Sequence, residues 1–366
     1  MPYDTDGNRP APGPAPDLHG EAARQFQICN ACRYCEGYCD VFPELFALPE
    51  VGQGDAVRLA NICHNCRGCH YACQYAPPHE FALNLPGVLA EVRQDSWERH
   101  ARPLWLGRAF HRHGMAVAAA LVAGLAALFA ALAALRPEEG AGFYAYLSHN
   151  AMVAIFAPAF LLPLLAIWLG LRGFWAEIGG GRPSLADWKR MAASVAALKN
   201  LSGGAGQGCN FEKEERFSSA RRHAHQATLW GFVMCFGATS AGTVMHYGLG
   251  WEAPYGPLSL PKLLGVPGGI LLCLGTAGLA WLKLKAEPHL GAPGVWGGEM
   301  AFVLLLFFVS ASGLALYAAT GTGAVPVLLA LHLGAVLAFF LLMPYSKMVH
   351  GFFRAAALLA RQTGRG

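Results

Sequence analysis

Eight cysteines in the N-terminal third of the chain fall into two runs with the same spacing. The first run is Cys29-x2-Cys32-x2-Cys35-x3-Cys39 and the second is Cys63-x2-Cys66-x2-Cys69-x3-Cys73. This spacing is typical of proteins with two [4Fe–4S] clusters, in which three cysteines of a run bind one cluster and the fourth binds the other. The spacing therefore predicts one cluster on Cys29, Cys32, Cys35 and Cys73, and a second on Cys63, Cys66, Cys69 and Cys39.

Two structural zinc sites are the main alternative for these cysteines. Zinc sites usually draw two close pairs of ligands that are separated by a longer spacer, whereas each run here holds four thiols within eleven residues. The spacing therefore favours iron–sulfur clusters. His64, His70 and His79 lie nearby in the sequence, and we expect them to be ordinary polar groups around a cluster rather than ligands.

Four histidines in or beside apolar segments are candidates for binding haem: His225, His246, His332 and His350. Histidine inside a membrane span is costly, which makes it a functional candidate. On one continuous helix, His332 and His350 would share a face about 27 Å apart, and His225 and His246 lie near the two ends of an earlier span. In antiparallel spans, His225 would meet His350 on one side and His246 would meet His332 on the other.

Two such pairs would hold two b haems, each with an axial imidazole on both faces, an arrangement that suits electron transfer. A single haem on one pair is an alternative, and intramembrane histidines also serve as proton relays. His223 is an alternative to His225, and His149 is an alternative to His246 or a candidate for lining a quinone site.

The composition indicates a membrane protein. Apolar residues make up 54% of the 366 residues, charged residues only 14%, and the mean hydropathy is +0.34, whereas a typical soluble domain has about 25% charged residues. The net charge is only +4 and no basic stripe is interleaved with aromatics, so we expect no nucleic-acid partner. Six apolar runs are each close to the ~20 residues that cross a bilayer as a helix, and they cover 115–135, 150–171, 226–247, 265–282, 299–319 and 324–344.

Three regions follow from these patterns. Residues 1–20 are rich in proline and glycine, which predicts a disordered leader; 21–113 form the cysteine-rich head; and 114–366 form a six-span membrane domain with a loop at 172–224. The predicted fold class is all-α. A helical ferredoxin-like head with two [4Fe–4S] clusters is followed by a six-helix transmembrane bundle like that of cytochrome b.

Charge in the connecting segments predicts the orientation of the spans. The loops and tail on the same side as the head carry fifteen Lys or Arg residues, whereas the loops on the opposite side carry only Arg136 and Lys262. By the positive-inside rule, the head and both termini face the cytoplasm. We expect no signal peptide, and therefore a protein of the bacterial inner membrane with free thiols, which favours metal binding over disulfides.

The loop at 172–224 holds two local patterns. Ser184 and Asp187 have the spacing of a capping box, which predicts the start of an amphipathic helix. Further along, Cys209 follows a glycine-rich stretch at 203–208 that lacks the Lys-Ser/Thr ending of a phosphate-binding loop. The sequence does not assign a role to this second pattern.

Several longer segments together resemble the tricarballylate/citrate-utilisation protein B family from about residue 21 onward. They read "CNACRYCEGYCDVFPELF", "YAPPHEFALN", "GCNFEKEERFSSARRHAH" and "LHLGAVLAFFLLMPYSKMVHGFFR". The resemblance implies a membrane protein that reoxidises the reduced flavin of a soluble FAD-dependent dehydrogenase acting on tricarballylate or a related tricarboxylate. The last span also resembles the C-terminal haem helix of the nitrate reductase cytochrome b subunit, which supports His332 and His350 as haem ligands.

The expected function is electron transfer from that flavoprotein, through the clusters and haem b, to membrane quinone. The chain has no Rossmann fingerprint, P-loop or hydrolytic triad, so it is expected to act as an electron-transfer subunit rather than as a stand-alone enzyme. A tricarboxylate transporter and a membrane redox sensor are the alternatives. The spans contain few Arg or Lys residues to hold a polyanion, which disfavours the transporter.

Overall fold

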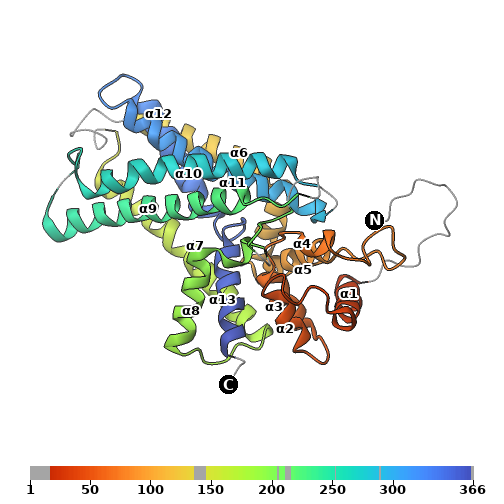
Figure 1. Cartoon of the computed structure of the whole chain (residues 1–366). Helices are drawn as coiled ribbons and strands as arrows, with labels where there is room; N and C mark the ends of the chain where they lie inside the picture. The colour runs from red at the N-terminus through yellow and green to blue at the C-terminus, as the bar shows by residue number, and fades with distance from the viewer. Residues whose placement is uncertain are drawn as a thin grey trace.

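The structure is a computed structural model that describes residues 17–135, 146–203, 206–210, 216–251, 253–287 and 290–363. Over these ranges the chain is mainly helical, and a short bridge between extended segments joins Cys209 to Ser218. The predicted all-α fold class is therefore confirmed. Figure 1 shows a helical head beside a bundle of long helices.

The head consists of five helices around a small apolar core. The fully buried side chains include Phe26, Val57, Leu89 and Val92, which join its first, third and fifth helices. The predicted leader at 1–20 lies outside the described residues up to 16, but α1 begins inside it at Leu18. The helices are α1 (Leu18–Cys32), α2 (Val41–Phe46), α3 (Gln53–Ile62), α4 (Gly68–Tyr71) and α5 (Leu85–His100).

Among the described residues, six helices are long and apolar enough to cross a membrane, which agrees with the six predicted spans. Most of them extend beyond the apolar runs. The first of the six, at Leu104–Ala134, begins in the predicted head and departs from helical geometry at His113. The second, at His149–Glu177, continues through Pro158 and Pro163. They are α6 (Leu104–Ala134), α7 (His149–Glu177), α9 (Ala220–Leu249), α10 (Leu260–Lys285), α11 (Trp296–Ala318) and α12 (Val325–Leu342).

One continuous last helix, as expected from the sequence, is not what the structure shows. Helix α12 ends at Leu342, turns follow, and a separate helix α13 (Val349–Thr363) carries His350. Pro344 lies in this break, and proline lacks the N–H that a continuing helix needs. His332 and His350 are therefore on different helices, and the shared face with a separation of about 27 Å that a continuous helix would give does not apply to them.

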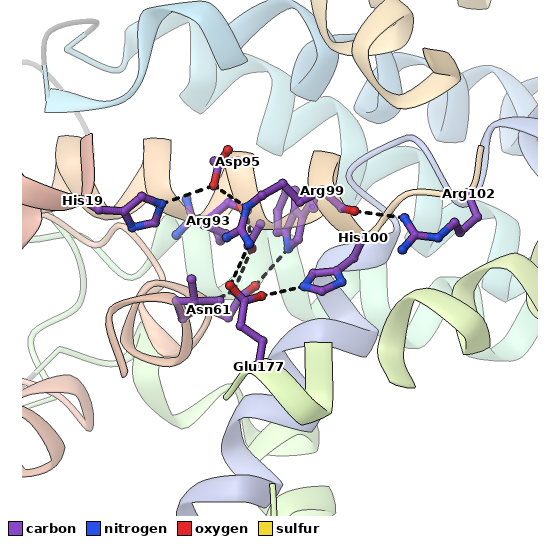
Figure 2. Close-up of polar contacts among 11 residues, drawn as sticks. His19, Asn61, Arg93, Asp95, Arg99, His100, Arg102 and Glu177 are labelled. Carbon is purple, nitrogen blue, oxygen red and sulfur yellow. Dashed lines mark hydrogen bonds and ion pairs between the residues drawn. The ribbon is translucent and has the colours of Figure 1, made fainter. Parts of the chain in front are cut away.

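Polar contacts attach the head to the membrane domain at the end of α7 (Figure 2). Glu177 accepts hydrogen bonds from Arg99 (2.7 Å) and from His100 Nε2 (2.6 Å), both in the last turn of α5. Gly170 allows the main chain to approach closely, because a Cβ there would lie 2.6 Å from the His100 carbonyl oxygen. Tyr345 adds a bond to the Arg102 carbonyl at 2.8 Å.

The predicted capping box is present at the start of α8 (Leu185–Ala197). The Ser184 hydroxyl accepts from the Asp187 main-chain N–H, and the Asp187 carboxylate accepts from the Ser184 N–H at 2.8 Å. Helix α8 packs against α13 below the bundle in Figure 1. Helix α13 also packs against α7, so both α8 and α13 lie at the end of the bundle for which a cytoplasmic location was predicted.

Candidate functional site

The structure brings together the four cysteines predicted for the first cluster. Helix α1 ends at Cys32 because Arg33 adopts the left-handed conformation, and this turn directs the chain back toward Cys35. Cys29, Cys32, Cys35 and Cys73 line one small cavity. Burial raises the pKa of the Cys29 thiol to about 12, and the neighbouring charges of Cys73, Cys35 and Cys32 add to this effect.

The four cysteines predicted for the second cluster form a separate group. Burial raises the pKa of Cys39, with further contributions from the charges of Cys66 and Cys63. The pKa of Cys69 is likewise raised by burial and by Cys66, Cys63 and Cys39. Cys39 thus lies with the second run although it belongs to the first, which is the exchange of fourth ligands that the spacing predicts.

The donor set of each group fits an iron–sulfur cluster. Among the described residues, no three His, Cys, Asp or Glu side chains converge on a site for one metal ion. A cluster of four irons holds its thiolates further apart than a single zinc ion does. Buried thiols that raise one another's pKa need a cationic centre to be stable as thiolates, and iron supplies that charge.

A cavity of about 630 Å³ lies between the second cysteine group and the membrane helices. His64 and Asn65 of the cysteine run form one wall, and Phe232, Phe302 and other apolar side chains of the bundle form another. His225 and His350 both face this cavity. The cavity therefore joins the head to the predicted haem region.

The rings of His225 and His350 lie at the separation that one metal ion between them would require. Their ring centroids are 5.9 Å apart with an angle of 77° between the rings. Imidazole–metal bonds of about 2 Å on either side of one ion place the two centroids about 6 Å apart. The Nδ1–H of His350 donates to the Lys347 carbonyl, which leaves Nε2 as the unprotonated nitrogen, as is usual for metal-binding histidines.

The ionisation of these rings also suits metal binding. Burial and the charge of Arg354 hold the pKa of His350 well below its usual range, so the ring is neutral. His225 Nδ1 is buried without a hydrogen-bond partner. His223, the alternative to His225, is exposed to solvent.

Cationic side chains dominate the polar lining of the cavity. Six of them face only two carboxylates, Glu287 and Glu299. One of the six is the half-buried Arg354, whose pKa is lowered by burial to about 9. An excess of positive charge suits the propionates of a haem and the negative charge of a thiolate-bound cluster. The six are Arg67, Arg93, Arg221, Arg354, Lys283 and Lys347.

The other two predicted histidines have different neighbours. His246 stacks on His149 with 4.1 Å between ring centroids, and this spacing is too short for a metal ion between the two rings. His149 Nε2 is 2.8 Å from the Tyr247 hydroxyl. His332 Nδ1 is 3.1 Å from the Ser312 hydroxyl, across the α11–α12 contact. The pairing of His246 with His332 therefore stays a prediction.

Two arginines that the sequence reasoning did not single out tie the histidine helices to the cysteine run. Arg221 lies four residues before His225 and donates to the Asn65 carbonyl at 2.7 Å. Arg354 lies four residues after His350 and donates to the Cys63 carbonyl at 2.8 Å. A spacing of four places each arginine on the same helix face as its histidine. This spacing is the sequence feature from which a role for the two arginines beside the histidines could have been predicted.

Comparisons with known proteins agree with this architecture. The family model for citrate utilization protein B matches residues 109–365, and the model for its Fer4-like domain matches residues 22–99. A curated relative from Escherichia coli, "Citrate utilization protein B", is 43% identical over 345 residues, which are 93% of this chain and 90% of the relative. No solved structure matches the chain.

Proposed function

Since this chain belongs to the citrate utilization protein B family and has its Fer4-like domain, we propose that it carries electrons from a soluble FAD-dependent dehydrogenase to membrane quinone. The substrate of that dehydrogenase is tricarballylate or a related tricarboxylate. The protein lies in the bacterial inner membrane with both termini in the cytoplasm. Two [4Fe–4S] clusters and haem b supply one-electron chemistry, which divides the two-electron oxidation of a reduced flavin into single steps.

One observation carries this proposal: residues within the second cysteine run line the same cavity as the His225–His350 pair. Cys63 and Cys66 flank His64 and Asn65, which line the cavity on the head side. A transporter or a structural zinc protein has no use for such an arrangement. Continuity between the two candidate cofactor sites is what an electron-transfer chain requires.

Exposure of the head favours entry of electrons at the first cysteine group. Tyr34, between Cys32 and Cys35, is 65% exposed, and Phe81 is 39% exposed. By contrast, the second group lies beneath the loop at 172–224 and next to the membrane domain. A soluble flavoprotein can approach the first group directly, whereas only the cavity separates the second group from the membrane histidines.

The test is a reduced-minus-oxidised difference spectrum of purified membranes to which the reduced flavoprotein and its substrate are added. Reduction of haem bands, followed by reoxidation when a quinone is supplied, supports the proposal. Clusters that change oxidation state without reduction of haem or quinone would instead indicate a redox sensor. Uptake of the tricarboxylate into vesicles without any spectral change would indicate a transporter.

A further inference from the structure

The segment around Cys209 lies against the second cysteine group, although more than one hundred residues separate them in sequence. The Asn210 main-chain N–H donates to the Cys66 carbonyl at 2.9 Å. Cys209 is buried, with only 1% of its surface exposed, and Cys66 packs against the apolar cluster to which it belongs. Leu198 and Leu201 complete an apolar cluster with Cys209 over Cys66.

The Asn210 side chain is fully buried, and neither its Oδ1 nor its Nδ2 has a hydrogen-bond partner. Its Oδ1 would lie 3.8 Å from a Cβ at Gly68, between Cys66 and Cys69. A buried amide without partners costs about 1–3 kcal/mol, so its retention in this position requires an explanation. The amide group lies beside Gly68 of the cysteine run, where a sulfur atom of a cluster would be an acceptor for its N–H.

The glycine-rich stretch explains how the chain reaches this position. Gly208 has a φ of +100°, and a Cβ there would lie 2.3 Å from the Ser218 carbonyl oxygen. Cys209 and Ser218 then exchange two main-chain hydrogen bonds of 2.9 and 3.0 Å, which fix the segment. Only glycine tolerates both the conformation and the close approach.

We infer that Cys209 and Asn210 donate hydrogen bonds to the sulfur atoms of the second cluster and thereby raise its reduction potential. This inference rests on the proposed function, because it requires the cluster. The Cys209 S–H lies 3.5 Å from the Leu201 carbonyl oxygen, and a sulfur atom of the cluster would be its alternative acceptor. Hydrogen bonds to cluster sulfurs favour the more negative, reduced form and are a main determinant of cluster potential.

The test is an EPR-monitored redox titration of the full-length, anaerobically purified protein. We expect Asn210→Leu and Cys209→Ala each to lower the equilibrium constant for reduction of one cluster roughly tenfold, which is a fall of about 59 mV in the potential of a one-electron couple. The potential of the other cluster should be unchanged. Cys209→Ser keeps a donor and should restore most of the potential. Cys235→Ala, in span α9, is the matched control and should change neither cluster.

Iron and sulfide contents make the outcomes distinct. Unchanged potentials in variants with full iron content overturn the inference. Loss of one cluster in Cys209→Ala and Cys209→Ser alike also overturns it, because the segment would then be needed for assembly rather than for the potential. Zinc in place of iron in the unmodified protein would instead overturn the proposed function itself.

Discussion

Arg354, which lies one helical turn after His350 in α13, donates a 2.8 Å hydrogen bond from its guanidinium to the carbonyl of Cys63. Its Nε also donates to the Asn61 carbonyl at 3.1 Å. A residue of the second cysteine group and a histidine of the membrane domain are thereby joined through one side chain and one turn of α13. This contact fixes their separation, which would govern electron transfer between the cofactors proposed to bind there.

Replacement of Arg354 tests this connection. In Arg354→Met both carbonyls lose a donor, so we expect electron transfer from the second cluster to haem to slow while reduction of the clusters by the donor keeps its rate. Stopped-flow absorbance at cluster and haem wavelengths separates the two phases. Arg221→Met, which loses the equivalent bond to Asn65, should give a similar result. An unchanged rate of haem reduction in both variants would show that these arginines do not position the second cluster relative to the haem.

The exchange of fourth ligands between the two runs gives a second prediction. Cys39→Ala should remove the cluster bound by Cys63, Cys66 and Cys69, and Cys73→Ala should remove the one bound by Cys29, Cys32 and Cys35. Each variant should retain about four irons. EPR spectra of the reduced proteins would identify the surviving cluster, and they should differ between the two variants. Ligation within each run would give the reverse assignment.

The haem ligands give a third prediction. His225→Ala and His350→Ala should each remove the haem associated with the cavity, because the loss of one axial imidazole opens the iron coordination. The double variant His246→Ala/His332→Ala should retain that haem. Haem quantitation by difference spectroscopy measures both results. A second haem lost only from the double variant would support the two-haem arrangement expected from the sequence.

Much of this site could be read from the sequence because its signals are local. The cysteine spacing predicted both groups, with Cys39 and Cys73 each placed with the other run, since a few residues between thiols restrict how they can surround a cluster. Hydropathy gave six spans because a bilayer demands a run of apolar residues of nearly constant length. Antiparallel topology was enough to predict that His225 would meet His350.

The remaining features depend on tertiary packing. The contact between His246 and His149 depends on how α7 and α9 are rotated about their axes, which periodicity within one helix does not reveal. The break at Pro344 moved His350 to a new helix, yet the ring still faces His225. A role for Asn210 could not be predicted from the sequence, because its neighbour Cys66 is distant in the sequence. The glycine-rich stretch before Asn210 also matches no known ligand-binding motif.

A buried ion triad beside the cavity gives a fourth prediction. Glu299 accepts from Lys283 (2.5 Å) and Lys347 (2.7 Å), and their side chains are mostly buried. Glu299→Gln leaves two ammonium groups close together without a counter-charge, and we expect a loss of about 3–5 kcal/mol in the free energy of unfolding. Thermal unfolding in detergent measures it. The double variant Glu299→Gln/Lys347→Met removes one of the two charges and should recover part of the loss.

The attachment of the head to α7 gives the last prediction. In Gly170→Ala the new methyl group would lie 2.6 Å from the His100 carbonyl oxygen, and α5 must move away from α7, which weakens the bonds of Arg99 and His100 to Glu177. Such overpacking costs about 1–3 kcal/mol. Gly124→Ala, in α6, is the matched control because nothing lies within 4 Å of its Cβ, and alanine favours a helix. Thermal unfolding should therefore begin at a lower temperature for Gly170→Ala alone, and equal stability of the two variants would show that this contact does not hold the head.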